Sequence, residues 1–295
     1  MIGYTANIIY WKAAASTYLY GSKVIFHQNG EVDFENKLMS PGKTVNTWYS
    51  QTNYQAKRFS PQLPILKKGK KYRLLLRARS FPEATLYLRL DFYDRSDLVI
   101  KQIFIKEMEE AFEYPDGAYY YTISLLNAGC VRLRFRYLVL APVEFPSARN
   151  TEILISRIYN VHASNELNII FEEPSLNACT VVRPEASFPF KNCVFVQSMV
   201  LNKKAYMTEF AVKRIEKICR DFKKITTWGC GPLSNVGAEY YAKILLGTSV
   251  YTSAVKSDLC KGIAAPLFSN STDLHAFQQK NSDKSSLRNT SKVSE

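Results

Sequence analysis

The sequence predicts an α+β chain of two domains: an antiparallel β-sandwich over residues 1–150 and a small α/β layered domain over residues 151–268. Three observations lead to this fold class. Alternating apolar and polar residues recur through the first half, as in LYLRLDFYD and VRLRFRYLV. Near residue 152 this pattern gives way to short apolar runs followed by helical periodicity. A chain of 295 residues is also long for a single hydrophobic core.

The strands of the first half are predicted from period-two alternation, in which every second side chain faces the same side. Residues 86–94 alternate apolar side chains with Tyr and charged side chains, and residues 131–139 alternate them with Arg132, Arg134 and Arg136. Similar runs occupy residues 71–79, 99–108 and 119–129. The turn-forming stretches SPGK, KKGKK, SFPEA, YPDGA and NAG separate them. Short strands at this spacing, without helices between them, are typical of a β-sandwich.

The second half alternates predicted strands and helices. ELNIIFEE (166–173) and CVFVQSM (193–199) are apolar runs of the kind found in buried parallel strands. Residues 205–222 carry an apolar stripe with helical spacing, supported by the pairs Glu209–Lys213 and Glu216–Arg220. A strand at KITTWG, a turn at GCGPLSN, a helix at 235–246 and a strand at TSVYTSA complete a small α/β unit. The polar tail 269–295 has little to bury, and we expect it to be disordered.

Composition narrows the function classes. The formal net charge of +13 favours acidic partners or an anionic membrane surface. The basic residues are spread along the chain and form no helix-turn-helix, zinc-finger or RNP pattern, so we expect no nucleic-acid partner. The N-terminal segment does not have the pattern of a signal peptide, and no apolar run is long enough to predict a membrane-spanning helix. The six cysteines have no CxxC spacing and predict free thiols in a reducing compartment, with the cytoplasm as the expected location.

Several stretches together resemble a known family. They are IIYWKAAASTYLYGSKV, VDFENKLMSPG, VNTWYSQTNYQAKRFSPQLPILKKGKKYRL, FEYPDGAYYYTISLLNAG and CVRLRFRYLVL, in this order. They are similar to the third component of the accessory Sec secretory system of Gram-positive bacteria, a member of the accessory secretory protein family. The resemblance covers residues 8–140 and leaves the second half unassigned.

The resemblance implies a β-sandwich similar to carbohydrate-binding modules. It further implies a cytoplasmic protein, peripheral at the inner face of the membrane, that assembles with two sister accessory proteins and the accessory motor ATPase. Such a complex serves the export of heavily glycosylated serine-rich-repeat adhesins. On this basis we expect a non-catalytic export component that binds its sister proteins and, as a further possibility, the cargo glycan.

A candidate glycan- or partner-binding surface lies in VNTWYSQTNYQAKRF. A sugar ring stacks on an aromatic plane, while amide and guanidinium groups bind its hydroxyls. The candidate residues are Trp48, Tyr49, Gln51, Asn53, Tyr54, Arg58 and, from a later strand, Tyr120. The alternative is that Trp48 belongs to the core and that the amides bind loop backbone. The arginine row at 132, 134 and 136 has two interpretations as well, a solvated charged face or a surface for an acidic partner.

The stretch GCGPLSNVGAEYYA suggests an alternative enzymatic function for the α/β unit, acting on glycan or acyl groups through the Gly229–Ser234 loop. Ser234 is the candidate nucleophile, but the G-x-S-x-G spacing is not met and no suitable histidine is nearby in sequence. A second interpretation is an anion site formed by Gly229, Gly231, Ser234 and Asn235 at a helix start. The third is a simple N-cap by Ser234 or Asn235.

No metal or cofactor is expected. The three histidines lie far apart in sequence, and no Cys or His spacing matches a zinc site. Cys230 in the glycine turn would be reactive if the helix dipole lowered its pKa, whereas the alternative is a small packing residue.

Overall fold

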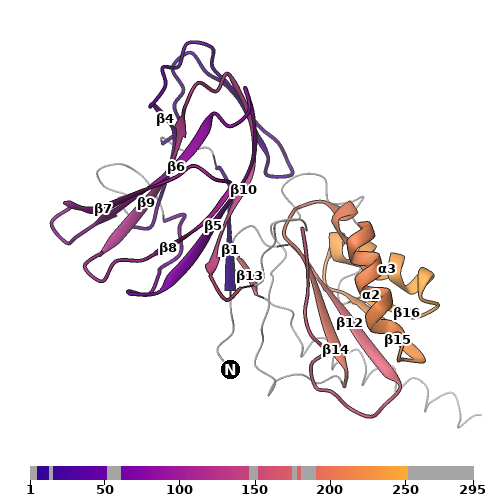
Figure 1. Cartoon of the computed structure of the whole chain (residues 1–295). Helices are drawn as coiled ribbons and strands as arrows, with labels where there is room; N and C mark the ends of the chain where they lie inside the picture. The colour runs from indigo at the N-terminus through magenta and orange to yellow at the C-terminus, as the bar shows by residue number, and fades with distance from the viewer. Residues whose placement is uncertain are drawn as a thin grey trace, which may run out of the picture. The chain divides into compact units, whose positions relative to one another are not determined.

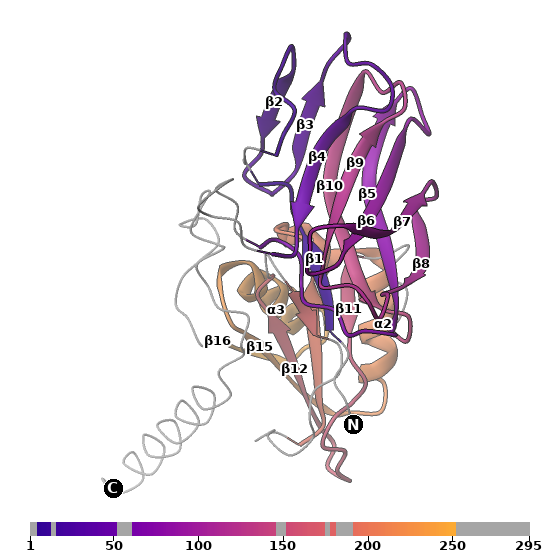
Figure 2. The same cartoon turned by 90° about the vertical axis from the view of Figure 1, so that its left-hand side faces the viewer.

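The computed structural model of the chain describes residues 5–12, 16–51, 61–145, 152–174, 178–180 and 191–251. These residues fall into two compact units. The first comprises the described residues within Tyr4–Arg149 and Leu176–Thr180, and the second comprises the rest. Each unit is drawn in Figures 1 and 2 and is described by itself below. The predicted tail 269–295 lies outside the described residues.

The first unit contains two antiparallel sheets, as the alternating sequence pattern predicts. The four-stranded sheet has the order β4-β9-β6-β7, and the seven-stranded sheet has the order β13-β1-β10-β3-β2, with β5 on the other side of β10 and β8 beside β5. The strands are β1 (Thr5–Ile9), β2 (Lys23–Phe26), β3 (Val32–Glu35), β4 (Thr44–Tyr49), β5 (Lys71–Phe81), β6 (Leu86–Tyr93), β7 (Val99–Ile105), β8 (Glu109–Glu113), β9 (Tyr120–Asn127), β10 (Arg132–Pro142) and β13 (Ala178–Thr180).

A single hydrophobic core lies between these two sheets. It takes Leu74 and Phe135 from the larger sheet and Leu90 and Ile123 from the smaller one, all fully buried. The alternation explains this arrangement, because the apolar residues of each strand share the face that meets the other sheet. The opposite faces carry the polar residues and form the surfaces considered below.

Strand β13 joins the larger sheet from a distant part of the sequence. It pairs antiparallel with β1, with Ala6 opposite Cys179. The predicted boundary near residue 150 assigns this segment to the second domain, whereas its backbone pairing belongs to the first unit. Pairing between segments so far apart leaves no signal in the local sequence pattern.

The second unit is an α/β layer with a mostly parallel sheet. Its order is β11-β14-β12-β15-β16, in which β11 alone runs antiparallel to its neighbour. The elements are β11 (Ile153–Ile155), β12 (Glu166–Glu172), β14 (Cys193–Ser198), the 3-10 helix η2 (Lys203–Met207), α2 (Glu209–Cys219), β15 (Lys224–Gly229), α3 (Pro232–Ile244) and β16 (Thr248–Tyr251). Helix α3 packs on the sheet through Tyr241, whose ring stacks on Phe171 with centroids 5.2 Å apart. The predicted buried strands and the strand at KITTWG are therefore confirmed.

The two helices begin at different residues from those predicted. The predicted helix 205–222 is divided at Thr208, whose hydroxyl accepts a hydrogen bond from the backbone N–H of Ala211 and so caps α2. Helix α3 begins at Pro232, inside the stretch predicted as a turn. Proline is well tolerated at the first helical position, because its fixed φ suits the helix and its missing N–H has no helical partner there.

Candidate functional site

Trp48 is a core residue, which corrects its assignment to a binding surface. Its side chain is 0% exposed, and its ring stacks on Phe135 at a centroid distance of 5.4 Å. The indole N–H donates a 3.0 Å hydrogen bond to the carbonyl of Tyr10. Both the ring face and the polar N–H are therefore used inside the first unit, and neither is available to a ligand.

Three other predicted residues, Tyr49, Gln51 and Tyr120, come together on the outer face of the four-stranded sheet. Tyr120 lies opposite Tyr93 in the β9–β6 register, and their rings stack with centroids 4.5 Å apart and planes 5° apart. Tyr49 lies on β4 close enough to Tyr93 for the two hydroxyls to interact electrostatically. The side-chain amide of Gln51 donates a hydrogen bond to the Tyr120 hydroxyl. We call this group, with Asp97 added below, the tyrosine cluster.

Asp97 completes the tyrosine cluster from the turn between β6 and β7. The Asp94 side chain accepts hydrogen bonds from the backbone N–H groups of Ser96 and Leu98, which fixes the turn. Asp97 has φ +61°, in the left-handed region that Asp tolerates. Its carboxylate accepts a hydrogen bond from the Tyr120 hydroxyl. Burial, followed by the interactions with Asp97, raises the pKa of Tyr120 to about 12.

The tyrosine cluster contains residues that the sequence analysis did not select. Asn53, Tyr54 and Arg58 lie outside the described residues, so the cluster is built from the other candidates. Tyr93 and Asp97 were missed. Alternation along 86–94 already places Tyr93 on the solvated face, but only the strand register shows that it meets Tyr120. Asp97 approaches through a turn whose shape the alternation does not specify.

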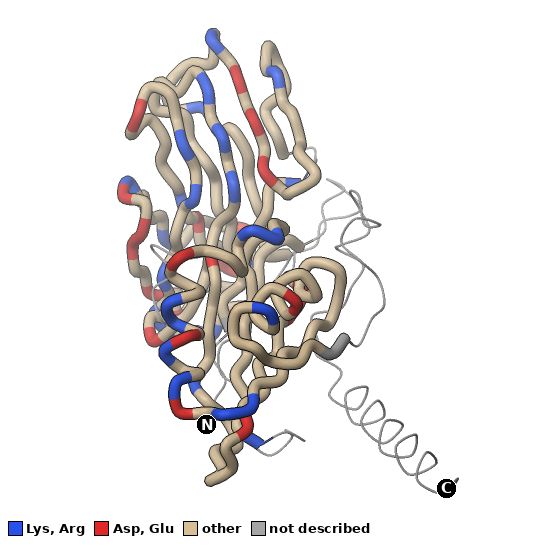
Figure 3. The backbone as a smooth tube through the Cα atoms, turned by 90° about the vertical axis from the view of Figure 1, so that its right-hand side faces the viewer, with Lys and Arg blue, Asp and Glu red and all other residues tan. Residues whose placement is uncertain are grey.

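The arginine row of β10 faces acidic residues in the neighbouring strand β3 and immediately before it. Arg134 donates to both carboxylate oxygens of Asp33, at 2.8 and 3.0 Å, and His27 contacts the same carboxylate at 2.7 Å. Arg136 pairs with Glu31 at 3.0 Å. Basic and acidic positions on neighbouring strands can be followed in Figure 3. The hydrogen bond from Arg134 is the main cause that lowers the pKa of Asp33. Two of the three arginines thus have acidic partners within this chain, and Arg132 forms no ion pair with any described side chain.

The glycine turn holds a carboxylate from its own chain. Glu173 follows β12, and the turn follows the adjacent parallel strand β15, so both lie at the same edge of the sheet. The Glu173 oxygens accept hydrogen bonds from the backbone N–H of Leu233, at 3.0 and 3.1 Å, and from that of Ser234, at 2.8 Å. A Cβ atom added at Gly231 would lie 2.8 Å from a Glu173 oxygen. Gly231 therefore leaves room for the glutamate, and the predicted anion site is already filled.

Ser234 is unsuited to the role of nucleophile, which corrects the enzymatic interpretation of this loop. It is 0% exposed. Its hydroxyl accepts from the backbone N–H groups of Cys230, at 3.0 Å, and Gly231, at 2.8 Å, and donates to the Gly231 carbonyl at 3.1 Å. The hydroxyl thus has a structural role in the turn. Asn235 is also largely buried, and its backbone N–H bonds the Gly231 carbonyl within α3.

The thiols of the described residues lie in buried or half-buried surroundings. Cys130, Cys193, Cys219 and Cys230 are thiols and not disulfides. Cys230 packs against the small apolar cluster of the second unit, as in its interpretation as a packing residue.

Among the described residues, no three His, Cys, Asp or Glu side chains form a group that could hold a metal ion. No helix in the described ranges is long and apolar enough to cross a membrane.

Comparison with known proteins assigns the chain to a family. Residues 17–142 match the family model Sec-ASP3, of the accessory Sec secretory system. An accessory Sec system protein from Streptococcus gordonii is 41% identical over 122 residues, which cover 77% of that protein and 41% of this chain. This chain belongs to the Sec-ASP3 family. The predicted resemblance is confirmed, and the tyrosine cluster and the arginine row both lie within the matched region.

Similarity to Sec-ASP3 proteins extends beyond the first unit. The accessory Sec system protein of Staphylococcus aureus is 29% identical over 259 residues, covering 84% of this chain and 77% of that protein. A solved chain of the Glycosylation Associate Protein (Gap123) complex from Streptococcus agalactiae is 27% identical. It covers 94% of this chain and 87% of its own length, with a TM-score of 0.57. The second unit is therefore shared with relatives and is not specific to this chain.

Proposed function

We propose that this chain is a subunit of the accessory Sec export machinery that assembles with two sister accessory proteins. The observation that carries the proposal is the similarity, over 94% of the chain, to a component of the Gap123 complex. Because this similarity includes both units, we infer that the full chain, rather than the first unit alone, takes part in assembly. Association with the motor ATPase and with serine-rich glycoprotein cargo, at the inner face of the membrane, extends the same proposal.

We further propose that the two units of the chain have separate roles. The first unit acts as a β-sandwich of the carbohydrate-binding type, and residues 151–268 act as a separate α/β domain. In support, the two antiparallel sheets share one core, while the parallel sheet has its own helix packed on it. The α/β domain has no assigned chemistry in this scheme, because its glycine turn is occupied by Glu173.

The tyrosine cluster is the surface that we propose for cargo glycan. Tyr49 and the Tyr93–Tyr120 pair provide aromatic planes, and Gln51 and Asp97 provide an amide and a carboxylate at their edge. Aromatic faces bind the C–H face of a sugar, while carboxylates and amides bind its hydroxyls. The stacking of Tyr93 on Tyr120 fixes both rings before binding, so little conformational entropy is lost when a ligand arrives.

The assembly proposal is tested with purified full-length chain and purified sister accessory proteins from the same organism. We expect co-elution as one complex in size-exclusion chromatography with light scattering. Separate elution at low ionic strength would contradict the proposal, since charge-assisted association is strongest there.

The glycan proposal is tested separately by saturation-transfer NMR with a panel of mono- and oligosaccharides. Tyr93→Ala should abolish saturation transfer to any sugar that the unmodified chain binds. Tyr20→Ala, an exposed tyrosine on a loop outside the cluster, is the matched control. If no sugar in the panel receives saturation, or if Tyr93→Ala leaves it unchanged, the cluster is not a glycan site.

A further inference from the structure

One end of the seven-stranded sheet carries a groove that the proposed function leaves unassigned. Four neighbouring strands, β2, β3, β10 and β5, place Lys23, Glu35, Arg132 and Phe81 in one row across the sheet. The next row contains Ile25, Asp33, Arg134 and Arg79. These side chains line a groove of about 570 Å³. We call it the basic groove.

The basic groove contains cationic groups whose charge is not neutralised within the described residues. Arg134 is engaged by Asp33. Among the side chains that the structure describes, none forms an ion pair with Lys23, Arg79 or Arg132. The Arg132 guanidinium instead lies over the Phe81 ring, 5.3 Å from its centroid. Its planar N–H groups are suited to bind a carboxylate in bidentate fashion.

Exposed apolar side chains surround the same end of the sheet. Phe81 is 60% exposed, Tyr20 85% and Leu38 89%. The loops that carry Tyr20 and Leu38 are held together by the buried Asn36. Its amide donates to the Tyr20 carbonyl at 2.9 Å, and its oxygen accepts from the Leu38 N–H at 2.9 Å. Ordered apolar residues exposed beside unpaired charges mark a surface for another macromolecule.

We propose that the basic groove and its apolar rim bind an extended acidic segment of a partner protein in the complex, with carboxylates placed between apolar side chains. The inference rests on the proposed function and names the surface through which one partner docks. Carboxylates would meet Arg79 and Arg132, and apolar side chains would pack on Phe81 and Ile25. Strand β2 ends the order of the described strands in its sheet, and its outer edge, which pairs with none of them, is where a strand of the partner would add.

The acidic residues of the basic groove favour an acidic protein segment over anionic lipid or nucleic acid. Asp33 and Glu35 line the same groove as the two arginines. A bilayer of anionic lipids or a nucleic acid carries dense negative charge that these carboxylates would repel. A peptide with isolated carboxylates can place them at Arg79 and Arg132 and keep apolar groups near Asp33 and Glu35. The mixed charge therefore favours a protein segment.

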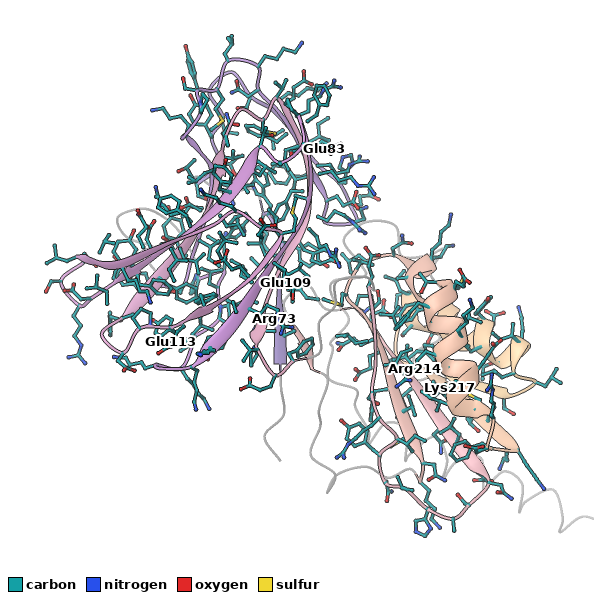
Figure 4. The ribbon with its side chains drawn as sticks, viewed as in Figure 1. Arg73, Glu83, Glu109, Glu113, Arg214 and Lys217 are labelled. Atoms are coloured by element: carbon teal, nitrogen blue, oxygen red, sulfur yellow. The ribbon has the colours of Figure 1, made fainter. Side chains whose placement is uncertain are left out.

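The test measures the affinity of the full-length chain for its purified sister proteins. We expect R79E/R132E to weaken binding by about tenfold or more and to reduce its dependence on salt. R79A/R132A and Phe81→Ala should weaken it by a smaller factor. The matched control is R214E/K217E, which makes the same charge change at two exposed residues of α2, labelled in Figure 4. We expect the control to stay within about twofold of the unmodified chain, as for a charge outside the contact.

Different outcomes of this test would overturn the basic groove as a docking surface and the proposed function of the chain. Full-affinity binding by R79E/R132E, or an equal loss in R214E/K217E, would overturn the groove while the assembly itself stands. Failure of the unmodified chain to bind any sister protein would overturn both. Vesicles of phosphatidylcholine with 30% phosphatidylglycerol, about the charge of an anionic leaflet, form a second arm. Vesicle binding that is lost in R79E/R132E, with assembly retained, would assign the groove to lipid and overturn the protein segment. A photo-crosslinking p-benzoylphenylalanine at position 81 should join an Asp- or Glu-containing segment of a sister protein.

Discussion

The Glu173 carboxylate caps helix α3 by accepting a 2.8 Å hydrogen bond from the backbone N–H of Ser234. The same carboxylate also accepts from the N–H of Leu233. The first turn of a helix has N–H groups without helical partners, and a buried one needs an acceptor. Here the acceptor comes from the end of a neighbouring strand. The turn resembles an anion site in sequence, but its N–H groups bind Glu173 and so connect the end of β12 to the start of α3.

Removing this cap should destabilise the second unit. Glu173→Ala leaves two N–H groups in a buried site without their acceptor, and we expect a loss of about 1–3 kcal/mol in the free energy of unfolding. The measurement is urea denaturation followed by circular dichroism. Glu239→Ala, which removes an exposed i,i+4 pair with Lys243 on the same helix, is the control and should cost about 0.5 kcal/mol or less. Equal effects of the two substitutions would contradict the capping role.

The cap should also give stability a defined pH dependence. Burial raises the pKa of Glu173 above 4.5, and the N–H groups of Ser234 and Leu233 oppose this shift only in part. The folded protein then binds this proton more tightly than the unfolded chain does. The resulting stabilisation is fully present below pH 4.5 and is lost as pH rises through the raised value. Glu173→Gln should remove this component from the stability–pH curve. An unchanged curve would show that Glu173 has the same pKa in both states.

Trp48 should contribute to stability and not to binding. Because the ring is buried against Phe135, Trp48→Ala creates a cavity and should cost about 3–5 kcal/mol. Trp48→Phe keeps an aromatic ring but loses the N–H bond to the Tyr10 carbonyl, and we expect about 1–3 kcal/mol. Thermal and urea unfolding measure both. Wild-type stability in Trp48→Ala would place the residue outside the core.

Asp33 should titrate below its ordinary range. Hydrogen bonds from Arg134 and His27 hold its pKa below 3.8. Its stabilising interaction is present above the unfolded-state value and is lost as pH falls through the lowered value. Carboxyl-detected NMR titration should show the pKa rising towards 3.8 in Arg134→Ala. In the control Arg132→Ala, the pKa of Asp33 should stay lowered, since Arg132 forms no ion pair with it.

Tyr120 should titrate near pH 12 in the folded protein. Burial is the largest cause, and the Asp97 carboxylate adds to it by accepting a hydrogen bond from the phenol and by its negative charge. Asp97→Asn removes the negative charge and should lower the pKa of Tyr120, as read from the ring carbon signals of labelled tyrosine. Asp94→Asn keeps a side-chain oxygen that can hold the turn and is the matched control. If Asp97→Asn had no effect, the carboxylate would not contact the hydroxyl.

The strands of this protein were largely predictable, because burial of one face of a strand produces alternating apolar and polar residues in the local sequence. The run 86–94 became β6 and the run 131–139 became the first part of β10. Strand β13 was not predictable. Its three residues show no alternation, and their partner β1 lies near the other end of the first unit's sequence. The start of α3 was misplaced because its cap, Glu173, comes from the residue that follows a different element, β12.

The candidate site was likewise predictable only in part. Aromatic residues at polar strand ends pointed to Tyr49 and Tyr120, but the residue type alone could not separate them from Trp48, which the core requires. Cross-strand register decided which rings meet, and it brought in Tyr93. The glycine turn illustrates the limit most clearly: Gly231 fits both an anion site and a packed carboxylate, and only the position of Glu173 distinguishes them.

Assembly is measured most directly by light scattering of the full-length chain mixed with its two purified sister accessory proteins, at low and at physiological ionic strength. We expect one complex that contains all three proteins, into which the R79E/R132E chain is incorporated poorly. Three separate species at both ionic strengths would show that this chain does not assemble with its sister proteins.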